Sequence, residues 1–400
     1  MSTTANFIIL FAIVFFIFRT IQRLYYLLKP NGQHKSYLFQ PSYSPKTDLE
    51  SFFITNNIKV QYKQILSRDG VILNYRIIGS GPKLIYLANG LAADLFMFYP
   101  ILRQLIRIYP NIFNEITLYT PSYRGIFNCF KNDTISTIYK PEDAYNVYIT
   151  MNACGNDVLD IMKDNNINKF DCIICWSLGT QMILTLAAST STNQHSAASD
   201  SSINQQFPTT ITNSNNHHDI TDKLFLLNPC TGYTLHYVLQ TFFPLPYTLR
   251  KVVCTIITSI LHILKILLST YVWDILKYIL ESYIFLLILE CLSFFGGFPP
   301  EQPPYFQQYL RDVFSSRYHT RGLLDLILAL DEPCTTEAVT LPHSTVILSG
   351  YPDSMTGVYL AYNLAKSMKN SKHVVFTMAS HFLLIEWPEI VAEELLKFIF

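Results

Sequence analysis

A serine stands where a buried strand is expected to give way to a helix. The apolar run 170–175 predicts a strand, Trp176-Ser177-Leu178-Gly179 follows it, and an apolar helix is expected at 181–188. A hydroxyl on such a sharp turn is held above the sheet edge, beside a helix N-terminus whose N–H groups stabilise an oxyanion. Ser177 is therefore a candidate nucleophile. A serine that only caps the helix is the competing interpretation.

A serine nucleophile needs a base, and the base needs an orienting carboxylate. His381 follows the expected strand 374–378 and precedes the expected helix 388–400, while Asp353 follows the expected strand 346–348. Both stand at the carboxyl ends of strands, where the catalytic groups of open parallel sheets gather. The chain order Ser177, Asp353, His381 predicts nucleophile, acid and base.

The acid could instead follow the preceding strand, 224–227. The residue there is Asn228, which is uncharged and cannot stabilise the imidazolium that forms as His381 takes the serine proton. The acidic residues at the end of the intervening segment, Asp331, Glu332 and Glu337, come before strand 346–348 and so are expected at the other end of the sheet. Asp353 is therefore the predicted acid.

Short apolar runs predict the elements that position these residues. The runs Val60–Leu66 and 71–77 are joined by Arg68-Asp69-Gly70, which favours a hairpin. Further strands are expected at 84–87, 116–119, 170–175, 224–227, 346–348 and 374–378, alternating with helices at 97–108, 154–162, 181–188 and 388–400. A hairpin followed by this alternation predicts an α/β fold with a mostly parallel sheet and helices on both faces.

The composition excludes some partners. Lys plus Arg and Asp plus Glu number 29 each, so there is no basic surplus that would indicate a nucleic-acid partner. The 8 cysteines are scattered, which does not resemble a disulfide framework. Cys172 and Cys175 lie in an expected strand, where residues three apart point to opposite faces, so a redox or metal pair is not favoured. No metal and no cofactor is expected, and the oligomeric state stays open.

The N-terminal segment predicts a membrane anchor. The run 7–18 is unbroken and apolar, and a helix over 5–28 reaches the about 20 residues that span a bilayer. Nothing basic precedes it, whereas Arg19, Arg23 and Lys29 follow, which favours an uncleaved anchor over a signal peptide and places the large domain in the cytosol at an endomembrane such as the endoplasmic reticulum. A helix lying in the interface is the alternative. The polar segment 29–58 is expected to be a stalk.

Two insertions divide the expected catalytic core into 59–188, 221–230 and 341–400. The first, 189–220, is a low-complexity polar segment and is expected to be disordered. The second, 231–340, follows the sixth expected strand and is read as an apolar helical cap. Its runs 252–268 and 271–295 contain charges such as Lys265 and Asp274. Each charge costs about 2.5–3.5 kcal/mol at mid-bilayer, which argues against ordinary spanning helices, although two true spans remain the alternative.

From about residue 60 onward the chain resembles the α/β-hydrolase superfamily, in particular its serine esterase and lipase-like members. Four motifs carry the resemblance, in the order of the family: Asn89-Gly90-Leu91, Ser122-Tyr123-Arg124-Gly125, Cys175-Trp176-Ser177-Leu178-Gly179, and the stretch from Ser380-His381-Phe382 to Glu386-Trp387-Pro388-Glu389. The resemblance implies an oxyanion hole formed by the backbone N–H groups of Leu178 and Leu91.

The sequence departs from the family pattern at three positions. Cys175 stands where the nucleophile turn usually has its first glycine, Asn89 where the oxyanion loop usually has histidine, and Ser122 where a structural aspartate is usual. None of these removes a member of the predicted triad. A serine at the turn also argues against the epoxide- and haloalkane-hydrolysing relatives, which place aspartate there.

These observations predict a membrane-anchored serine hydrolase that cleaves an ester, or a thioester or amide, of a lipid-like substrate through an acyl-enzyme on Ser177. The anchor and the apolar cap both favour a substrate that partitions into a membrane. Acyl transfer by the same triad is the alternative enzyme. An inactive scaffold that acts as an interaction protein at a membrane is the alternative from another class, and an intact triad speaks against it.

Overall fold

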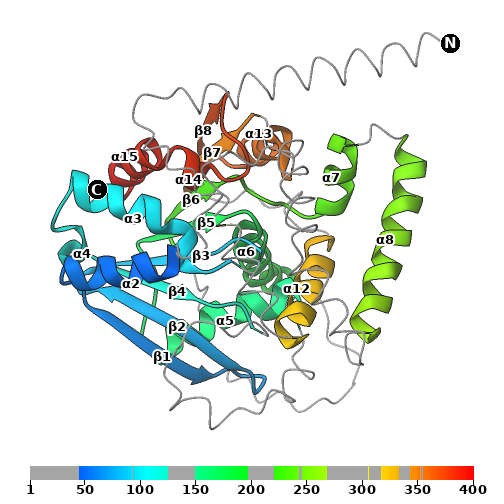
Figure 1. Cartoon of the computed structure of the whole chain (residues 1–400). Helices are drawn as coiled ribbons and strands as arrows, with labels where there is room; N and C mark the ends of the chain where they lie inside the picture. The colour runs from blue at the N-terminus through cyan, green and yellow to red at the C-terminus, as the bar shows by residue number, and fades with distance from the viewer. Residues whose placement is uncertain are drawn as a thin grey trace.

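The computed structural model describes residues 45–91, 93–124, 149–196, 220–242, 246–267, 305, 317–332, 343–351, 353 and 355–400 (Figure 1). The expected anchor at 5–28, the expected stalk before residue 45, most of the low-complexity segment and the apolar run 271–295 lie outside these ranges. Within them, no helix is long and apolar enough to cross a membrane.

An eight-stranded sheet forms the centre of the molecule, with the order β1-β2-β4-β3-β5-β6-β7-β8. Its strands are β1 (Val60–Leu66), β2 (Ile72–Gly79), β3 (Lys83–Ala88), β4 (Ile116–Pro121), β5 (Cys172–Trp176), β6 (Lys223–Leu227), β7 (Ser344–Gly350) and β8 (Asn370–Phe376). β2 pairs antiparallel with β1 and β4, whereas all pairs from β4 through β8 are parallel. The predicted hairpin and mostly parallel sheet are confirmed.

Helices cover both faces of this sheet (Figure 1). They are α2 (Pro45–Thr55), η2 (Leu95–Phe98), α3 (Tyr99–Ile108), α4 (Ile112–Glu115), α5 (Met151–Asp164), α6 (Leu178–Ser196), α7 (Thr234–Phe242), α8 (Tyr247–Leu267), α12 (Arg317–Leu330), α13 (Gly357–Ser367), α14 (Leu383–Glu386) and α15 (Pro388–Ile399). Of the segment 231–340, expected to form a helical cap, the structure describes helices α7, α8 and α12, which lie between β6 and β7.

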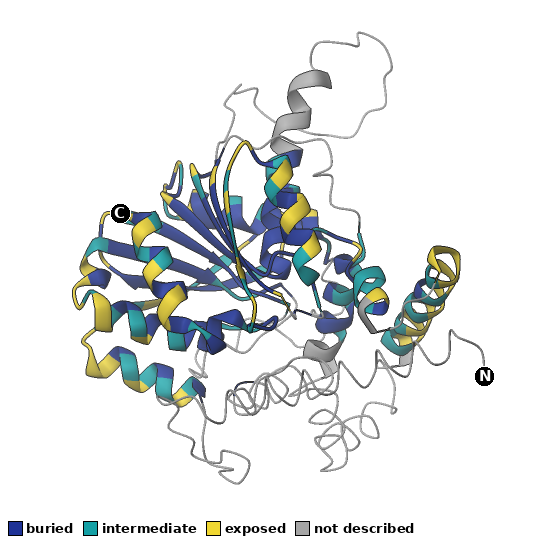
Figure 2. Cartoon of the chain, turned by 90° about the horizontal axis from the view of Figure 1, so that it is seen from above, coloured by how far each residue is buried: buried dark blue, intermediate teal, exposed yellow. Residues whose placement is uncertain are grey.

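The central strand β5 shows how one short apolar run supplies two cores. Ile173 and Cys175 contribute to the core beneath α5, α6 and α12, whereas Cys172, Ile174 and Trp176 contribute to the core beneath α3 and α15. Such alternation follows from the two-residue period of a strand. Figure 2 shows the inner strands of the sheet mostly buried, and every residue of β5 is buried. The two cysteines lie on opposite faces and are free thiols, as the spacing predicts.

The structure moves two boundaries of the predicted organisation. The carboxyl part of the expected stalk is helix α2, which buries Leu49 and Phe53 in the core. A four-residue spacing places these two side chains on one helical face, and packing of that face outweighs the polar composition around it. Helix α6 extends to Ser196 and thus includes the first residues of the segment expected to be disordered from 189.

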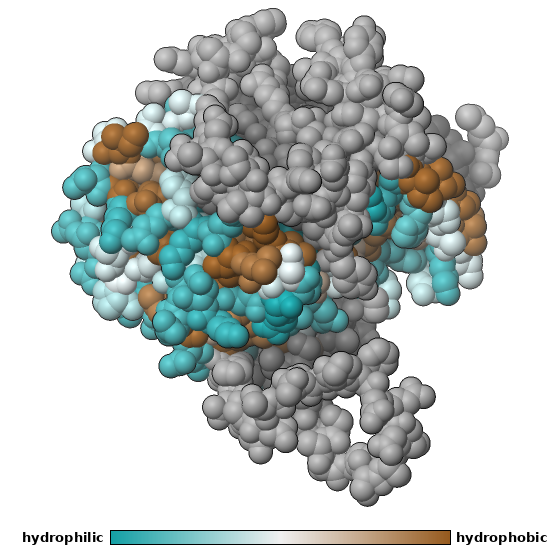
Figure 3. Space-filling model, turned by 90° about the horizontal axis from the view of Figure 1, so that it is seen from below, coloured by the Kyte–Doolittle hydropathy of each residue, from teal (hydrophilic) through white to brown (hydrophobic). Residues whose placement is uncertain are grey.

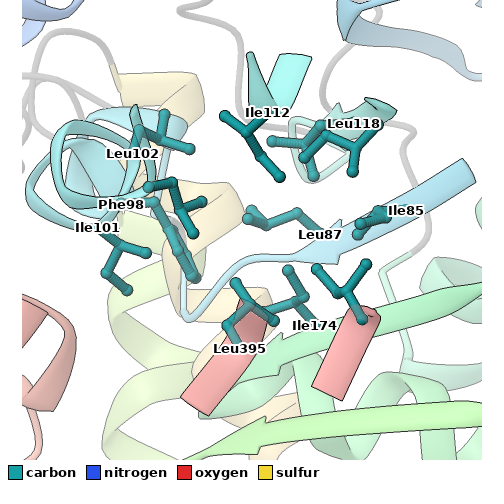
Figure 4. A pocket seen from close by; sticks show the side chains of 12 residues that line it. Ile85, Leu87, Phe98, Ile101, Leu102, Ile112, Leu118, Ile174 and Leu395 are labelled. Carbon is teal, nitrogen blue, oxygen red and sulfur yellow. The ribbon is translucent and has the colours of Figure 1, made fainter. Parts of the chain in front are cut away.

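A cavity of about 20 Å³ lies between the sheet and helices α3 and α15. Its lining is entirely aliphatic or aromatic, and Figure 4 shows Phe98, Leu102 and Ile112 around it. A void of this size without polar partners stays dry. None of Ser177, Asp353 and His381 lines it, so it is a packing void and not a ligand site.

Candidate active site

Ser177 occupies a strained turn between β5 and α6. Its φ is +52°, in the left-handed region that costs a residue with a side chain about 1–3 kcal/mol. The turn is held by its own backbone: Ser177 N–H donates to Leu227 O at 3.0 Å, and Ser177 O accepts from Thr180 N at 3.0 Å and from Cys230 N at 3.2 Å. Helix α6 begins directly after the serine, earlier than the sequence predicts.

Two glycines allow this turn to approach the neighbouring strand. A Cβ at Gly179 would lie 2.3 Å from Ala88 O, and a Cβ at Gly90 would lie 2.6 Å from the ring of Trp176. No side chain larger than hydrogen fits at either position. Cys175, which stands where the family has a further glycine, is a fully buried residue of β5, and burial raises the pKa of its thiol. It packs as a small apolar side chain.

The structure brings the three predicted site residues together. His381 Nε2 lies 3.0 Å from Ser177 Oγ, and His381 Nδ1 lies 2.9 Å from Asp353 Oδ2. All three residues are buried, and they follow β5, β7 and β8 at the carboxyl ends of parallel strands. The distances are within the range of a nucleophile, base and orienting acid.

The carboxylate of Asp353 is tightly bound. Its Oδ1 accepts from Met355 N at 2.7 Å and Thr356 N at 3.0 Å, and its Oδ2 also accepts from Thr356 Oγ1 at 2.7 Å. Burial alone would raise the pKa of Asp353, but His381 and the hydrogen bonds from Thr356 outweigh it and hold this pKa below its ordinary value. Asp353 therefore faces the histidine as an anion.

Asn228 joins three segments around the histidine. Its Nδ2 donates to Ser380 O at 3.0 Å and to His381 O at 2.7 Å, while its Oδ1 accepts from Gly350 N at 2.8 Å. The residue has a φ of +43° and is 1% exposed. Sequence reasoning treats Asn228 only as a rejected acid. A polar residue directly after a buried strand, at the same edge as Asp353, is the signal that could indicate this role.

Two further side chains fix the histidine loop. Trp176 Nε1 donates to His381 O at 3.2 Å. The buried Glu386 accepts from Ser380 N at 2.6 Å and from the Ser380 hydroxyl. The backbone on both sides of His381 is thus held by the side chains of Trp176, Asn228 and Glu386. These contacts limit the positions that the imidazole can adopt.

The loop expected to complete an oxyanion hole begins beside the serine turn. Ala88 at the end of β3 pairs with Cys175 of β5, so Asn89, Gly90 and Leu91 follow next to the turn. The Tyr123 hydroxyl donates to Asn89 O, and Asn89 Nδ2 donates to Pro121 O at 3.1 Å. Asn89, where the family has histidine, thus ties its loop to the end of β4. Leu178 is the first residue of α6, at a helix N-terminus.

Arg124 is a buried cation two residues after Ser122, the position where the family usually has a structural aspartate. Its guanidinium donates to Asp157 Oδ2 of α5 at 2.9 Å and to Asp69 Oδ2 of the β1–β2 turn at 2.6 Å. Burial raises the pKa of Asp157 to about 6. Burial would also raise the pKa of Asp69, but hydrogen bonds from Arg124 and Ser67 lower it. Two acids from other elements therefore balance this buried cation.

Within the described residues, no group of three or more His, Cys, Asp or Glu side chains is placed to hold a metal ion. The site consists of a serine, a histidine, a carboxylate and backbone N–H groups. Those groups are the components of acyl transfer through a covalent intermediate.

No protein-family model matches the sequence, and no curated protein matches it. Solved structures do match in fold. An esterase from Exiguobacterium antarcticum has 15% identity and a TM-score of 0.53, covering 85% of this chain and 99% of its own. A hydrolase from Pseudomonas aeruginosa has 16% identity and a TM-score of 0.51, covering 85% and 98%. A haloalkane dehalogenase from Bradyrhizobium elkani has 13% identity and a TM-score of 0.52, covering 86% and 97%.

The chain therefore has the α/β-hydrolase fold, as its motifs predict. The names of these neighbours cover more than one reaction, so the fold by itself does not select a chemistry. The residues at the nucleophile turn must do so.

Proposed function

We propose that this chain is a serine hydrolase that cleaves a carboxylic ester, or a thioester or amide of the same reactivity, through an acyl-enzyme on Ser177. The observation that carries the proposal is the chain of contacts from Ser177 Oγ to His381 Nε2 at 3.0 Å and from His381 Nδ1 to Asp353 Oδ2 at 2.9 Å. A serine at this turn favours acyl chemistry over dehalogenation.

In the proposed reaction, Ser177 Oγ attacks the substrate carbonyl carbon while His381 Nε2 takes the hydroxyl proton. Asp353 stabilises the imidazolium and keeps its Nδ1–H oriented. The backbone N–H groups of Leu178 and Leu91 receive the oxyanion of the tetrahedral intermediate. His381 then protonates the leaving group, and the ester between Ser177 and the acyl group remains. A water molecule, deprotonated by His381, releases the acid and restores the serine.

We propose a lipid-like substrate and attachment of the chain to a membrane, with the catalytic domain in the cytosol. Support comes from the apolar N-terminal segment with its basic carboxyl flank, and from the apolar composition of the cap between β6 and β7. An alcohol in place of water as acyl acceptor would make the same triad an acyltransferase.

A fluorophosphonate probe tests the nucleophile. The full chain should be labelled, and Ser177→Ala should abolish labelling. Ser349→Ala is the matched control, because Ser349 also contacts a histidine, His373 Nε2, at 2.7 Å. The control should label like the parent. An unlabelled parent chain that is folded would refute the proposal and favour an inactive scaffold, and labelling that survives Ser177→Ala would assign another nucleophile.

A further inference from the structure

Helix α8 has an apolar face that the folded domain leaves exposed. Figure 2 shows the helix at the edge of the molecule with exposed residues along it, and Figure 3 shows apolar side chains at the same edge. The exposed side chains share one chemistry, aliphatic, and have exposed fractions of 47% to 68%; they are Leu249, Val252, Ile256, Ile260, Ile263 and Ile266. We call these six residues the α8 stripe.

The spacing of the α8 stripe places its members along one side of the helix. Successive members are three or four residues apart, which is the spacing of neighbours on a helical face. The stripe from Leu249 to Ile266 runs for about 25 Å along the axis. The opposite side faces the domain: Cys254 is buried, and Lys265 pairs with Asp325 of α12. The domain side is therefore already packed, and the stripe is a second apolar surface.

The charges of α8 are of one sign. Its charged residues are Arg250 and Lys251 near its start and Lys265, which pairs with Asp325 of α12, and the helix contains no Asp or Glu. Tyr247 at its start is exposed, with the Arg250 guanidinium 5.7 Å from its ring centroid. An exposed apolar stripe beside basic and aromatic side chains is typical of helices that lie in the plane of a membrane interface, where anionic headgroups attract the cations.

Helix α8 is connected to the edge of the sheet that carries the candidate site. His236 of α7 stacks on Tyr247 with ring centroids 6.4 Å apart, and it contacts Tyr233 edge-on. Tyr233 is three residues beyond Cys230, whose N–H donates to Ser177 O. A surface that contacts the α8 stripe is thus joined through one short helix to the nucleophile turn.

We propose that the α8 stripe is a docking surface for a lipid bilayer that contains anionic headgroups, with α8 lying in the interface. Binding to the bilayer depends only on the α8 stripe. The role of this binding, which is to hold the active site close to a lipid-like substrate, rests on the proposed function. A membrane is favoured over a second copy of the chain because two copies of α8 would bring together the cations Arg250 and Lys251 of each copy, with no acidic residue from this helix to pair with them. The helix does not qualify as a membrane span.

Depth-dependent quenching tests the contact directly. Ile256→Trp and Ile54→Trp are made in the full chain and mixed with phosphatidylcholine vesicles, with and without phosphatidylserine, whose acyl chains carry bromine. Ile54 of α2 is the matched control, since it is an isoleucine that is 81% exposed and lies outside α8. The fluorescence of the Trp introduced at position 256 should shift to the blue and be quenched by bromine, and both effects should be larger with phosphatidylserine. The fluorescence of the Trp introduced at position 54 should neither shift nor be quenched. Equal behaviour at the two positions overturns the proposal, as does a shift at 256 that depends on protein concentration and not on bromine.

Activity separates this inference from the proposed function. The double variant Ile256→Glu/Ile260→Glu should lose on the order of tenfold or more of turnover on an ester embedded in vesicles, because two exposed aliphatic side chains that would enter the bilayer become charged. Ile54→Glu should lose none. Turnover of a short water-soluble ester should stay unchanged in both. An equal loss on both esters in the double variant would contradict a docking role. A parent chain inactive on both esters would refute the proposed function, while the quenching result would still decide the membrane contact.

Discussion

Two serine–histidine contacts lie among the described residues, and they differ in backbone conformation and in the groups around them. Ser177 Oγ and His381 Nε2 are 3.0 Å apart, and Ser349 Oγ and His373 Nε2 are 2.7 Å apart. The first pair lies on loops after β5 and β8, with Asp353 behind the histidine. The second pair lies within the adjacent strands β7 and β8, and among the described residues no carboxylate is bonded to His373. By contact distance alone, the second pair would be chosen.

The difference lies in backbone and charge. Ser177 is held at a φ of +52° beside the N-terminus of α6, where an oxyanion can be stabilised, whereas Ser349 is a regular residue of a strand. Asp353 stabilises a protonated His381. Among the residues that the structure describes, His373 has no carboxylate partner, and burial lowers its pKa, which disfavours the protonated form that a general base must reach. A serine–histidine contact therefore indicates catalysis only with the strained turn and the acid.

Removal of each serine should separate the two pairs most strongly. Ser177→Ala should lower kcat on a soluble ester by up to about 10⁶-fold, because the acyl-enzyme cannot form. Ser349→Ala should change kcat less than about threefold, since it removes one hydrogen bond that does not involve Ser177, His381 or Asp353. Steady-state kinetics with both purified variants measure this. Comparable losses in the two variants would break the distinction drawn between the pairs.

Asp353→Asn tests whether the acid is what makes His381 a base. The amide can still accept from Met355 N and Thr356 N, so the turn should fold. Its NH₂ would however donate to Nδ1 and favour the tautomer that carries the proton on Nε2, which cannot take the serine proton. We expect kcat to fall about 10⁴-fold. A fall of less than about tenfold in a folded variant would show that the carboxylate is dispensable.

Asn228→Ala should have a smaller effect on the same pair. It removes the amide that bonds Ser380 O, His381 O and Gly350 N, so the histidine loop should shift. Misplacement of a catalytic group by about 1 Å costs about 10²-fold, and we expect a loss of about 10- to 100-fold in kcat with little change in KM. Reduced thermal stability with unchanged kcat would limit Asn228 to a structural role.

A rescue experiment sharpens the assignment of the acid. A carboxylate placed at position 228 would follow β6, the other strand end from which an acid could reach the histidine. The Asn228 side chain faces His381 O and not Nδ1, however. Asn228→Asp should therefore restore no activity to Asp353→Asn. Recovery of more than about tenfold would mean that the histidine can take its acid from either strand end.

The sequence reveals the three candidate site residues because each comes within five residues of the end of a strand, and strand ends can be recognised from short apolar runs. It does not reveal the groups that hold the triad. The contact of Asn228 with His381 spans 153 positions, and no local pattern encodes it. Glu386 is visible only as part of a family motif, and its bonds to Ser380 require the turn before α14. Helix α2 is missed because Leu49 and Phe53 are sparse in a polar stretch and are buried only by the rest of the fold.

A second comparison concerns two buried carboxylates whose pKa values move in opposite directions. His381 and Thr356 outweigh burial at Asp353 and lower its pKa, whereas burial prevails at Asp157 and raises its pKa to about 6 despite the contact with Arg124. Between pH 5 and 7 the unfolded chain has both groups ionised, because the ordinary value is 3.8. Of these two carboxyl groups, only Asp157 binds a proton in the folded chain in the lower part of that window.

The stability of the folded chain should therefore contain a pH-dependent part that Asp157 alone supplies. Since the folded state holds a proton that the unfolded state releases, this stabilisation is fully present below about pH 3.8 and is lost as the pH rises through about 6. From pH 5 to pH 7 the loss amounts to about 1–1.5 kcal/mol.

Asn cannot titrate, so Asp157→Asn should lose less stability than the parent over this range, by that amount. Urea unfolding at the two pH values measures it. Glu394→Gln is the control, because hydrogen bonds from Lys372 and Lys397 lower the pKa of the Glu394 carboxyl, which is therefore largely ionised in both states over the window, and its removal should change the slope little. A parent-like slope in Asp157→Asn would place the pKa of Asp157 below the window, with the Arg124 ion pair stronger than the burial that opposes it.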